Sequence, residues 1–309
     1  MPRNAPATPS GGDQPAPEAF FWRTRDGLWL GARLWTPPPD AAAPSGPWPV
    51  LCLPGLSRNG RDFAALATRL AAAGHRVIVM DYRGRGLSDR DPDWRNYAIP
   101  IEAQDIDTGL DALGLERFAV VGTSRGGLHA MLLAIRRPAA VAAIVLNDIG
   151  PQIEMAGLRR IAESIGKDMT APDWQTAAER LSKTFGHQFP VLTSADQWLR
   201  LARQLYRDQS DGLCLDYDPD LARPLAGLDD GEPPADLWSA FPALASVPLF
   251  ILRGENSDIL SPATVTRMLA EHPRADAIVV PGQGHAPMLW EDAIQSQILE
   301  FIQRAAAPR

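Results

Sequence analysis

Residues 118–127, with the sequence FAVVGTSRGG, decide the fold of this chain. The apolar run 118–121 predicts a buried strand, and the apolar residues after Gly127 recur at helical spacing. The pattern G-x-S-x-G around Ser124 lies between them, as in a tight strand-to-helix turn that raises a serine hydroxyl above the edge of a sheet. Such a turn strains its backbone and leaves room only for small neighbours. Ser124 is therefore a candidate nucleophile, and the alternative is an ordinary helix N-cap.

The segments on either side of this stretch repeat a strand–helix rhythm. Apolar runs at 50–53, 77–80 and 142–146 alternate with amphipathic helical patterns, and the rhythm returns with runs at 249–252 and 277–280. The runs are continuously apolar, as in strands buried on both faces. The sequence therefore predicts an α/β fold with a mostly parallel central sheet and helices on both faces. Alternating residues in 19–35, broken at Arg25–Gly27, predict a β-hairpin before it.

The rhythm stops between residues 152 and 240, where helical patterns occur without apolar strand runs. We therefore expect a helical cap, residues 152–240, inserted into a core formed by residues 19–151 and 241–309. The acidic stretch Asp229–Asp236 contains proline and resembles a linker. Residues 1–18 are rich in Pro, Ala and Gly, which predicts a disordered tail.

A serine nucleophile of this kind needs a histidine base on a loop after the last strand. Of the five histidines, His285 meets this condition, in the stretch 281–287, PGQGHAP. The small residues around it leave the ring free to reach the serine. His285 is therefore the candidate base.

The triad acid is expected after a strand, between the nucleophile and the histidine in the chain. Asp258 follows the strand predicted at 249–252 and is the favoured candidate. Asp148 ends the strand before the cap and is the alternative, with a structural role in the cap hinge as its other interpretation. Glu255 is a third, weaker candidate. The acid would orient the imidazole of His285 and stabilise its protonated form.

An oxyanion hole needs two backbone N–H groups directed at the substrate carbonyl oxygen. One is expected from Arg125, the residue after the nucleophile. The other is expected from Leu56, on the loop that follows the strand at 50–53; a plain turn is the alternative interpretation of this loop. The role of the Arg125 side chain is left open.

The composition excludes several classes of function. The 309-residue chain has 30 Lys and Arg against 37 Asp and Glu, a net charge of −7, and no basic run, so neither nucleic acid nor an anionic membrane is an expected partner. Cys52 and Cys214 make neither a disulfide framework nor a zinc site, and no metal-binding, dinucleotide or Walker pattern occurs. We therefore expect no metal and no cofactor. No signal-peptide or membrane-spanning stretch is present, so a cytoplasmic location is expected.

Four features together resemble the α/β-hydrolase superfamily from about residue 20 onward: Pro54-Gly55-Leu56, the loop DYRGRGLSD at 81–89, the Ser124 turn, and Gly284-His285. The stretch NDIGP at 147–151 resembles a cap-entry motif of bacterial members. The chain has Pro54-Gly55 where the family usually has His-Gly. By resemblance the 81–89 loop is structural, and the serine sets the chain apart from dehalogenases and epoxide hydrolases, which use aspartate. The activities that remain are carboxylesterase, lactonase, C–C bond hydrolase and the perhydrolase activity of cofactor-free haloperoxidases.

We therefore expect a carboxylesterase-like serine hydrolase that cleaves a small to medium ester or lactone through an acyl-enzyme. Trp174 and Trp198 of the predicted cap either line the substrate pocket or pack within the cap. A C–C bond hydrolase of a vinylogous diketone acid is the alternative, and Arg125 or Arg58 could then bind the substrate carboxylate. A non-catalytic small-molecule binder on the same fold is a further alternative. The patterns indicate no oligomeric state.

Overall fold

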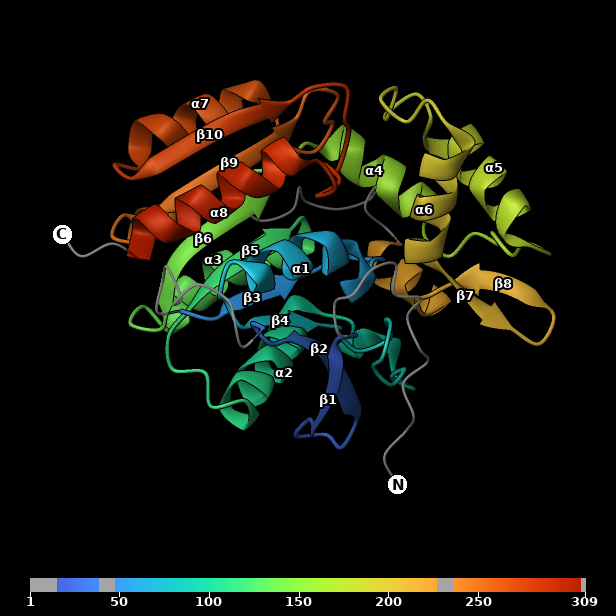
Figure 1. Ribbon diagram of the computed structural model, residues 1–309, viewed down its shortest axis with the longest axis horizontal. Coiled ribbons are helices and arrows are strands. Elements are labelled where there is room, and N and C mark those ends of the chain that lie inside the picture. The colour runs from blue at the N-terminus through green and yellow to red at the C-terminus, as the bar shows by residue number, and fades with distance from the viewer. Residues whose placement is uncertain (1–15, 39–47, 227–235, 307–309) are drawn as a thin grey trace.

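A computed structural model describes residues 16–38, 48–226 and 236–306. An eight-stranded sheet forms its centre, in the order β1-β2-β4-β3-β5-β6-β9-β10 (Figure 1). The strands are β1 (Glu18–Arg23), β2 (Trp29–Trp35), β3 (Val50–Leu53), β4 (Val77–Met80), β5 (Phe118–Thr123), β6 (Val141–Asn147), β9 (Leu249–Gly254) and β10 (Ala275–Val280). The β2 strand is antiparallel to both neighbours, and all pairings from β4 to β10 are parallel. The predicted mostly parallel sheet and the hairpin before it are confirmed.

Helices cover both faces of this sheet and enclose two apolar cores. Helices α1 (Ala64–Ala72) and α8 (Asp292–Ala306) pack on one face. Helices α2 (Ile99–Ala112), α3 (Arg125–Arg136) and α7 (Pro262–Glu271) pack on the other. Every residue of β3, β4, β5 and β6 is buried, which explains why these strands appear in the sequence as continuous apolar runs.

The register of the central strands sets the position of the residues that follow them. Thr123, the last residue of β5, pairs with Asn147, the last residue of β6. The two parallel strands therefore end level with each other at the same edge of the sheet. Ser124 and Asp148, the next residues in the chain, therefore lie beside each other at that edge.

The chain between β6 and β9 contains α4 (Met155–Ser164), α5 (Trp174–Phe185), α6 (Ala195–Leu205), β7 (Tyr206–Gln209) and β8 (Gly212–Leu215). We call residues 155–225 the insertion. Its helices α5 and α6 and the β7–β8 hairpin share an apolar cluster of their own and lie together at one end of the molecule (Figure 1). The expectation of helices alone was wrong for the hairpin, because strands of four residues are too short to give a clear sequence pattern.

Two sequence expectations fall partly or wholly outside the described residues. The linker expected at 229–236 lies almost entirely within 227–235, and most of the tail expected at 1–18 lies within 1–15. Glu18, which was expected in the tail, already belongs to β1. None of the helices in the described ranges has the length and apolar character needed to cross a bilayer.

Candidate active site

Ser124 lies on a sharp turn between β5 and α3. Its backbone has φ +51° and ψ −117°, a strained conformation for a residue with a side chain. A Cβ atom on Gly122 would lie 2.4 Å from the carbonyl oxygen of Gly126, and one on Gly126 would lie 2.0 Å from that of Leu53. No side chain fits at either position, so the two glycines of the motif are required by close backbone contacts.

His285 connects the serine to a carboxylate. It lies on the loop after β10, where the sequence places it, and its Nε2 atom is 2.8 Å from Ser124 Oγ. Its Nδ1 atom is 2.8 Å from Asp148 Oδ2. A carboxylate oxygen only accepts hydrogen bonds, so Nδ1 carries the proton and Nε2 accepts from the serine hydroxyl. The ring is nearly buried, with 7% of the side chain exposed.

Asp148 is held in place by several other groups. Its side chain is fully buried, and its Oδ1 accepts a hydrogen bond of 2.8 Å from the Gly254 amide. Oδ2 also accepts one of 2.6 Å from the Ser257 hydroxyl. The backbone of Asp148 adopts φ +60°, which turns its side chain toward His285 directly after β6 ends. These donors fix the carboxylate before any substrate binds.

The expectation that Asp258 contacts His285 is not met. The turn after β9, closed by a hydrogen bond from the Ser257 amide to the Gly254 carbonyl, directs Asp258 toward helix α4. There both carboxylate oxygens accept hydrogen bonds from Arg160, at 2.5 and 2.9 Å. Partial burial alone would raise the pKa of Asp258, but the ion pair with Arg160 lowers it below the usual value. Ser257, not Asp258, is the residue of this loop that contacts the site. Glu255 accepts from the Gly282 amide and is exposed.

The two residues expected to form an oxyanion hole lie near Ser124. Leu56, on the loop after β3, lines the same cavity as Ser124 and His285. Its amide donates to no other group within the part of the chain that the structure describes. Arg125 is the first residue of α3, so its amide has no acceptor within the helix and lies at the positive end of the helix dipole.

The Arg125 side chain is bound away from the cavity. Its Nε donates to Glu102 at 2.6 Å and its Nη2 to the Tyr97 carbonyl at 3.2 Å. Glu102, on α2, is fully buried and also accepts from Arg85 and His129. Burial alone would raise the pKa of Glu102, but Arg125, Arg85 and His129 together hold it well below the usual value. This network was not predicted from the sequence, although Arg85 belongs to the 81–89 motif.

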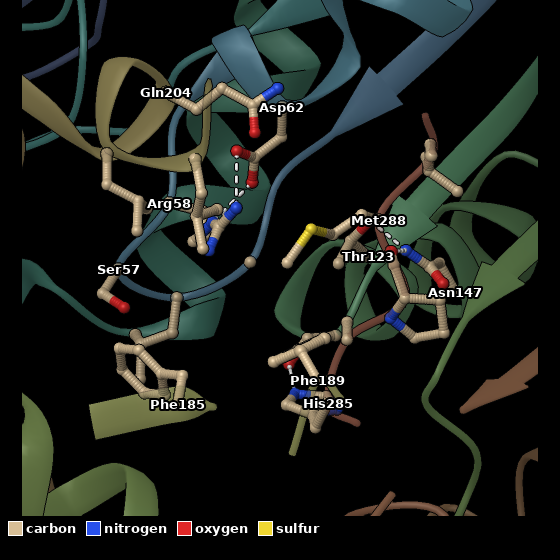
Figure 2. Close-up of a pocket in the computed structure, with 18 of the residues that line it drawn as sticks. Ser57, Arg58, Asp62, Thr123, Asn147, Phe185, Phe189, Gln204, His285 and Met288 are labelled. Atoms are coloured by element: carbon tan, nitrogen blue, oxygen red, sulfur yellow. Dashed lines mark hydrogen bonds and ion pairs between the residues drawn. The ribbon is translucent and has the colours of Figure 1, made fainter. Parts of the chain in front are cut away.

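A cavity of about 130 Å³ surrounds the serine; we call it the inner chamber. Figure 2 shows Ser57, Arg58 and Phe185 on one side of it, and Thr123, Met288 and His285 on the other. The insertion contributes apolar side chains to its wall, namely Ile161, Phe185, Phe189, Leu201 and Leu205. Met288 and Trp290, soon after His285 in the chain, also line it and were not identified from the sequence.

A second cavity of about 380 Å³, the outer chamber, adjoins the first. Arg58, Arg160 and Phe185 are among the residues that line both, so the two chambers are direct neighbours. The outer chamber is bounded by the ends of α4, α5 and α6. Lys167 lines this chamber but not the inner one.

Trp174 and Trp198 line neither chamber, so their expected role in substrate binding is not supported. Trp198 is buried in the apolar cluster of the insertion, where its indole N–H donates to the Leu192 carbonyl. Trp174 packs against the same cluster, with the Arg203 guanidinium 5.0 Å from its ring centre. Both residues therefore pack within the insertion, which was the alternative interpretation of their positions in the sequence.

Comparisons with known proteins agree with this fold. Residues 49–208 match the model of the α/β-hydrolase fold. The 3-hydroxybutyrate-oligomer hydrolase of Cupriavidus necator is 33% identical over 262 residues, which cover 81% of this chain and 86% of that protein. The 2-(acetamidomethylene)succinate hydrolase of Mesorhizobium japonicum is 28% identical over 242 residues, 78% of this chain and 82% of that protein. The solved structure of an α/β hydrolase from Novosphingobium aromaticivorans is 40% identical, with a TM-score of 0.85, and the match covers 95% of this chain and 100% of that one. The chain belongs to the α/β-hydrolase fold family.

Proposed function

We propose that the protein is a serine hydrolase that cleaves carboxylic esters through an acyl-enzyme, with Ser124, His285 and Asp148 as its triad. The observation that carries this proposal is a continuous chain of two hydrogen bonds. His285 is 2.8 Å from Ser124 Oγ through Nε2 and 2.8 Å from Asp148 Oδ2 through Nδ1. Proximity of this kind activates a serine that is otherwise a weak nucleophile.

The geometry supports a two-step reaction. His285 takes the proton of Ser124 as the serine oxygen attacks the ester carbonyl, and Asp148 stabilises the imidazolium that results. The amides of Leu56 and Arg125 donate to the developing oxyanion. His285 then returns the proton to the departing alcohol. A water molecule, deprotonated by the same histidine, cleaves the acyl-enzyme and releases the acid.

The two chambers indicate the size and chemistry of the substrate. We propose that the insertion acts as a cap over Ser124, with apolar walls that suit a small to medium molecule. Oligomers of 3-hydroxybutyrate, the substrate in the name of one relative, are linear esters that end in a carboxylate, and a substituted succinate also carries carboxylates. Three cationic side chains line the outer chamber: Arg58 and Arg160, which are paired with Asp62 and Asp258, and Lys167. We therefore propose a short ester with a carboxylate at its far end.

The test combines active-site labelling with turnover. A fluorophosphonate should label the wild-type protein at Ser124, and p-nitrophenyl butyrate and the linear 3-hydroxybutyrate dimer should both be hydrolysed. Ser124→Ala should abolish labelling and lower kcat by several orders of magnitude while the far-UV circular dichroism spectrum is unchanged.

Two results would contradict the proposal. A folded Ser124→Ala protein with near-normal turnover would rule out Ser124 as the nucleophile. Rapid cleavage of a vinylogous 1,5-diketone acid with negligible ester hydrolysis would favour the C–C hydrolase alternative.

A further inference from the structure

The side chain of Glu102 is linked by hydrogen bonds to both segments that carry the expected oxyanion donors, directly to α3 and through Arg85 to the loop of Leu56. Its carboxylate is completely buried on α2 and is not part of the chain of hydrogen bonds through Ser124, His285 and Asp148. Oε1 accepts from Arg85 Nη1 at 2.8 Å, and Oε2 accepts from Arg125 Nε at 2.6 Å and from His129 Nε2 at 3.0 Å. A buried carboxylate costs free energy unless it is paired, and here each oxygen is paired.

The first connection runs to the loop that carries Leu56. The Arg85 guanidinium donates from Nη1 to Glu102 and from Nε to the Leu56 carbonyl, the second bond at 2.8 Å. Its side chain is inaccessible to solvent and lies 5.5 and 5.6 Å from the ring centres of Tyr82 and Tyr97. The Arg85 side chain is therefore held in one conformation, and it fixes the backbone of Leu56, whose amide would face the substrate oxygen.

The second connection runs to the first turn of α3. Arg125 supplies the other expected amide donor, and its side chain is bound to the same carboxylate. His129, one turn further along α3, contacts Glu102 as well. The beginning of α3 is thus held against α2 at two points, and the direction of the Arg125 N–H depends on both.

We propose that Glu102 is a positioning residue that sets the two oxyanion donors relative to each other, through Arg85 on one side and Arg125 on the other. This inference rests on the proposed ester hydrolysis. Two N–H groups stabilise an oxyanion only if both are directed at one point, so a shared anchor between their two elements controls that alignment. Ground-state binding of the ester depends on the chamber walls and is much less sensitive to it.

The test is Glu102→Gln, which keeps the shape of the side chain and removes its charge. We expect kcat for p-nitrophenyl butyrate to fall about 10- to 100-fold, somewhat less than the loss of an entire oxyanion donor, while KM stays within about twofold. The inhibition constant of a butyl trifluoromethyl ketone, which forms a tetrahedral oxyanion on the serine, should rise in proportion to the loss in kcat/KM. Glu102→Asp, which keeps the charge, should restore part of the activity.

Asp105→Asn is the matched control. Asp105 lies on the same helix, and its buried carboxylate binds the Arg83 guanidinium, which contacts neither Leu56 nor Arg125. Arg83 meets the network only through its backbone carbonyl, which accepts from Arg85 and is not altered by the change. This variant should lose stability but keep kcat and the inhibition constant. If Glu102→Gln does not fold, Arg125→Gln removes one connection alone and should show a smaller loss of the same kind.

The outcomes separate the two proposals. A wild-type protein that hydrolyses no ester would overturn the proposed function. An active wild type together with a folded Glu102→Gln protein of unchanged kcat and unchanged ketone inhibition would overturn the role of Glu102. So would equal losses in Glu102→Gln and Asp105→Asn.

Discussion

The Asp148 carboxylate accepts hydrogen bonds from His285, from the Ser257 hydroxyl and from the Gly254 amide. Asp148→Asn would keep the size of the side chain but present an N–H group where an acceptor is needed. The imidazole of His285 would then favour the wrong tautomer. We expect kcat to fall on the order of 10⁴-fold in steady-state assays with p-nitrophenyl butyrate, by analogy with the serine protease triad.

The companion variant is Asp258→Asn. Asp258 pairs with Arg160 at the wall of the chamber, so its loss should change kcat by less than about tenfold. If Asp258→Asn proved far more damaging than Asp148→Asn, the acid would have to be reassigned to the loop after β9.

The sequence was sufficient to place Ser124 and His285, because both positions follow from local patterns: a glycine-flanked turn and a loop after the last strand. It was not sufficient to choose between two aspartates, because that choice depends on how a loop turns. Asp148 directly follows the last residue of β6, whereas Asp258 lies four residues beyond the end of β9. The distance from the strand end was the one available signal. Glu102 was missed because its partners come from a distant loop and helix.

At the level of elements, the strands and helices of the core were predicted well, since their apolar periodicity extends over whole segments. The insertion was predicted less well. Its β7–β8 hairpin is short, and its tryptophans at helical positions fit packing and pocket lining equally in a sequence. Only the packing of α5 against α6 shows that Trp198 faces the inside of the insertion.

The loop after α4 contains Lys167, whose charge should affect which esters the protein binds. Lys167 lines the outer chamber and is exposed, and its ammonium has no partner among the described residues. Lys167→Gln should therefore weaken binding of esters with a free carboxylate, raising KM for the linear 3-hydroxybutyrate dimer about fivefold. KM for the methyl ester of the same dimer should not change, and the effect should decrease as salt is added.

The control for this change is Lys183→Gln, at the other lysine of the sequence, which lies on α5 and lines neither chamber. It alters the net charge equally and should leave both KM values as they are. Equal KM values for the free acid and the methyl ester in the wild type would instead show that the outer chamber does not recognise the carboxylate.

For the whole molecule, two buried histidines make stability depend on pH. Burial lowers the pKa of His129 and of His272 below the usual value near 6.5. His272 contacts the Leu244 carbonyl through Nε2 and accepts from the Arg274 amide through Nδ1, which requires the neutral ring. Below pH 6.5 the unfolded chain therefore binds more protons than the folded one, and stability decreases as the pH falls.

We expect the free energy of unfolding in urea to be lower at pH 5.5 than at pH 7.5, by on the order of 1–2 kcal/mol. His272→Gln keeps a donor for Leu244 and should reduce this difference between the two pH values. Equal unfolding free energies at both pH values would show that neither histidine resists protonation in the folded state.

The level ends of β5 and β6 have a consequence for how this protein could change over time. Ser124 and Asp148 both precede the insertion in the chain, and the sheet register alone sets the distance between them. Only His285 comes later, on a loop anchored by the last strand of the same sheet. A change of length or sequence in the insertion would therefore leave unchanged the strand register that places Ser124 beside Asp148. A chimera that carries the corresponding segment of a relative should acquire that relative's substrate preference and keep its reactivity toward fluorophosphonate.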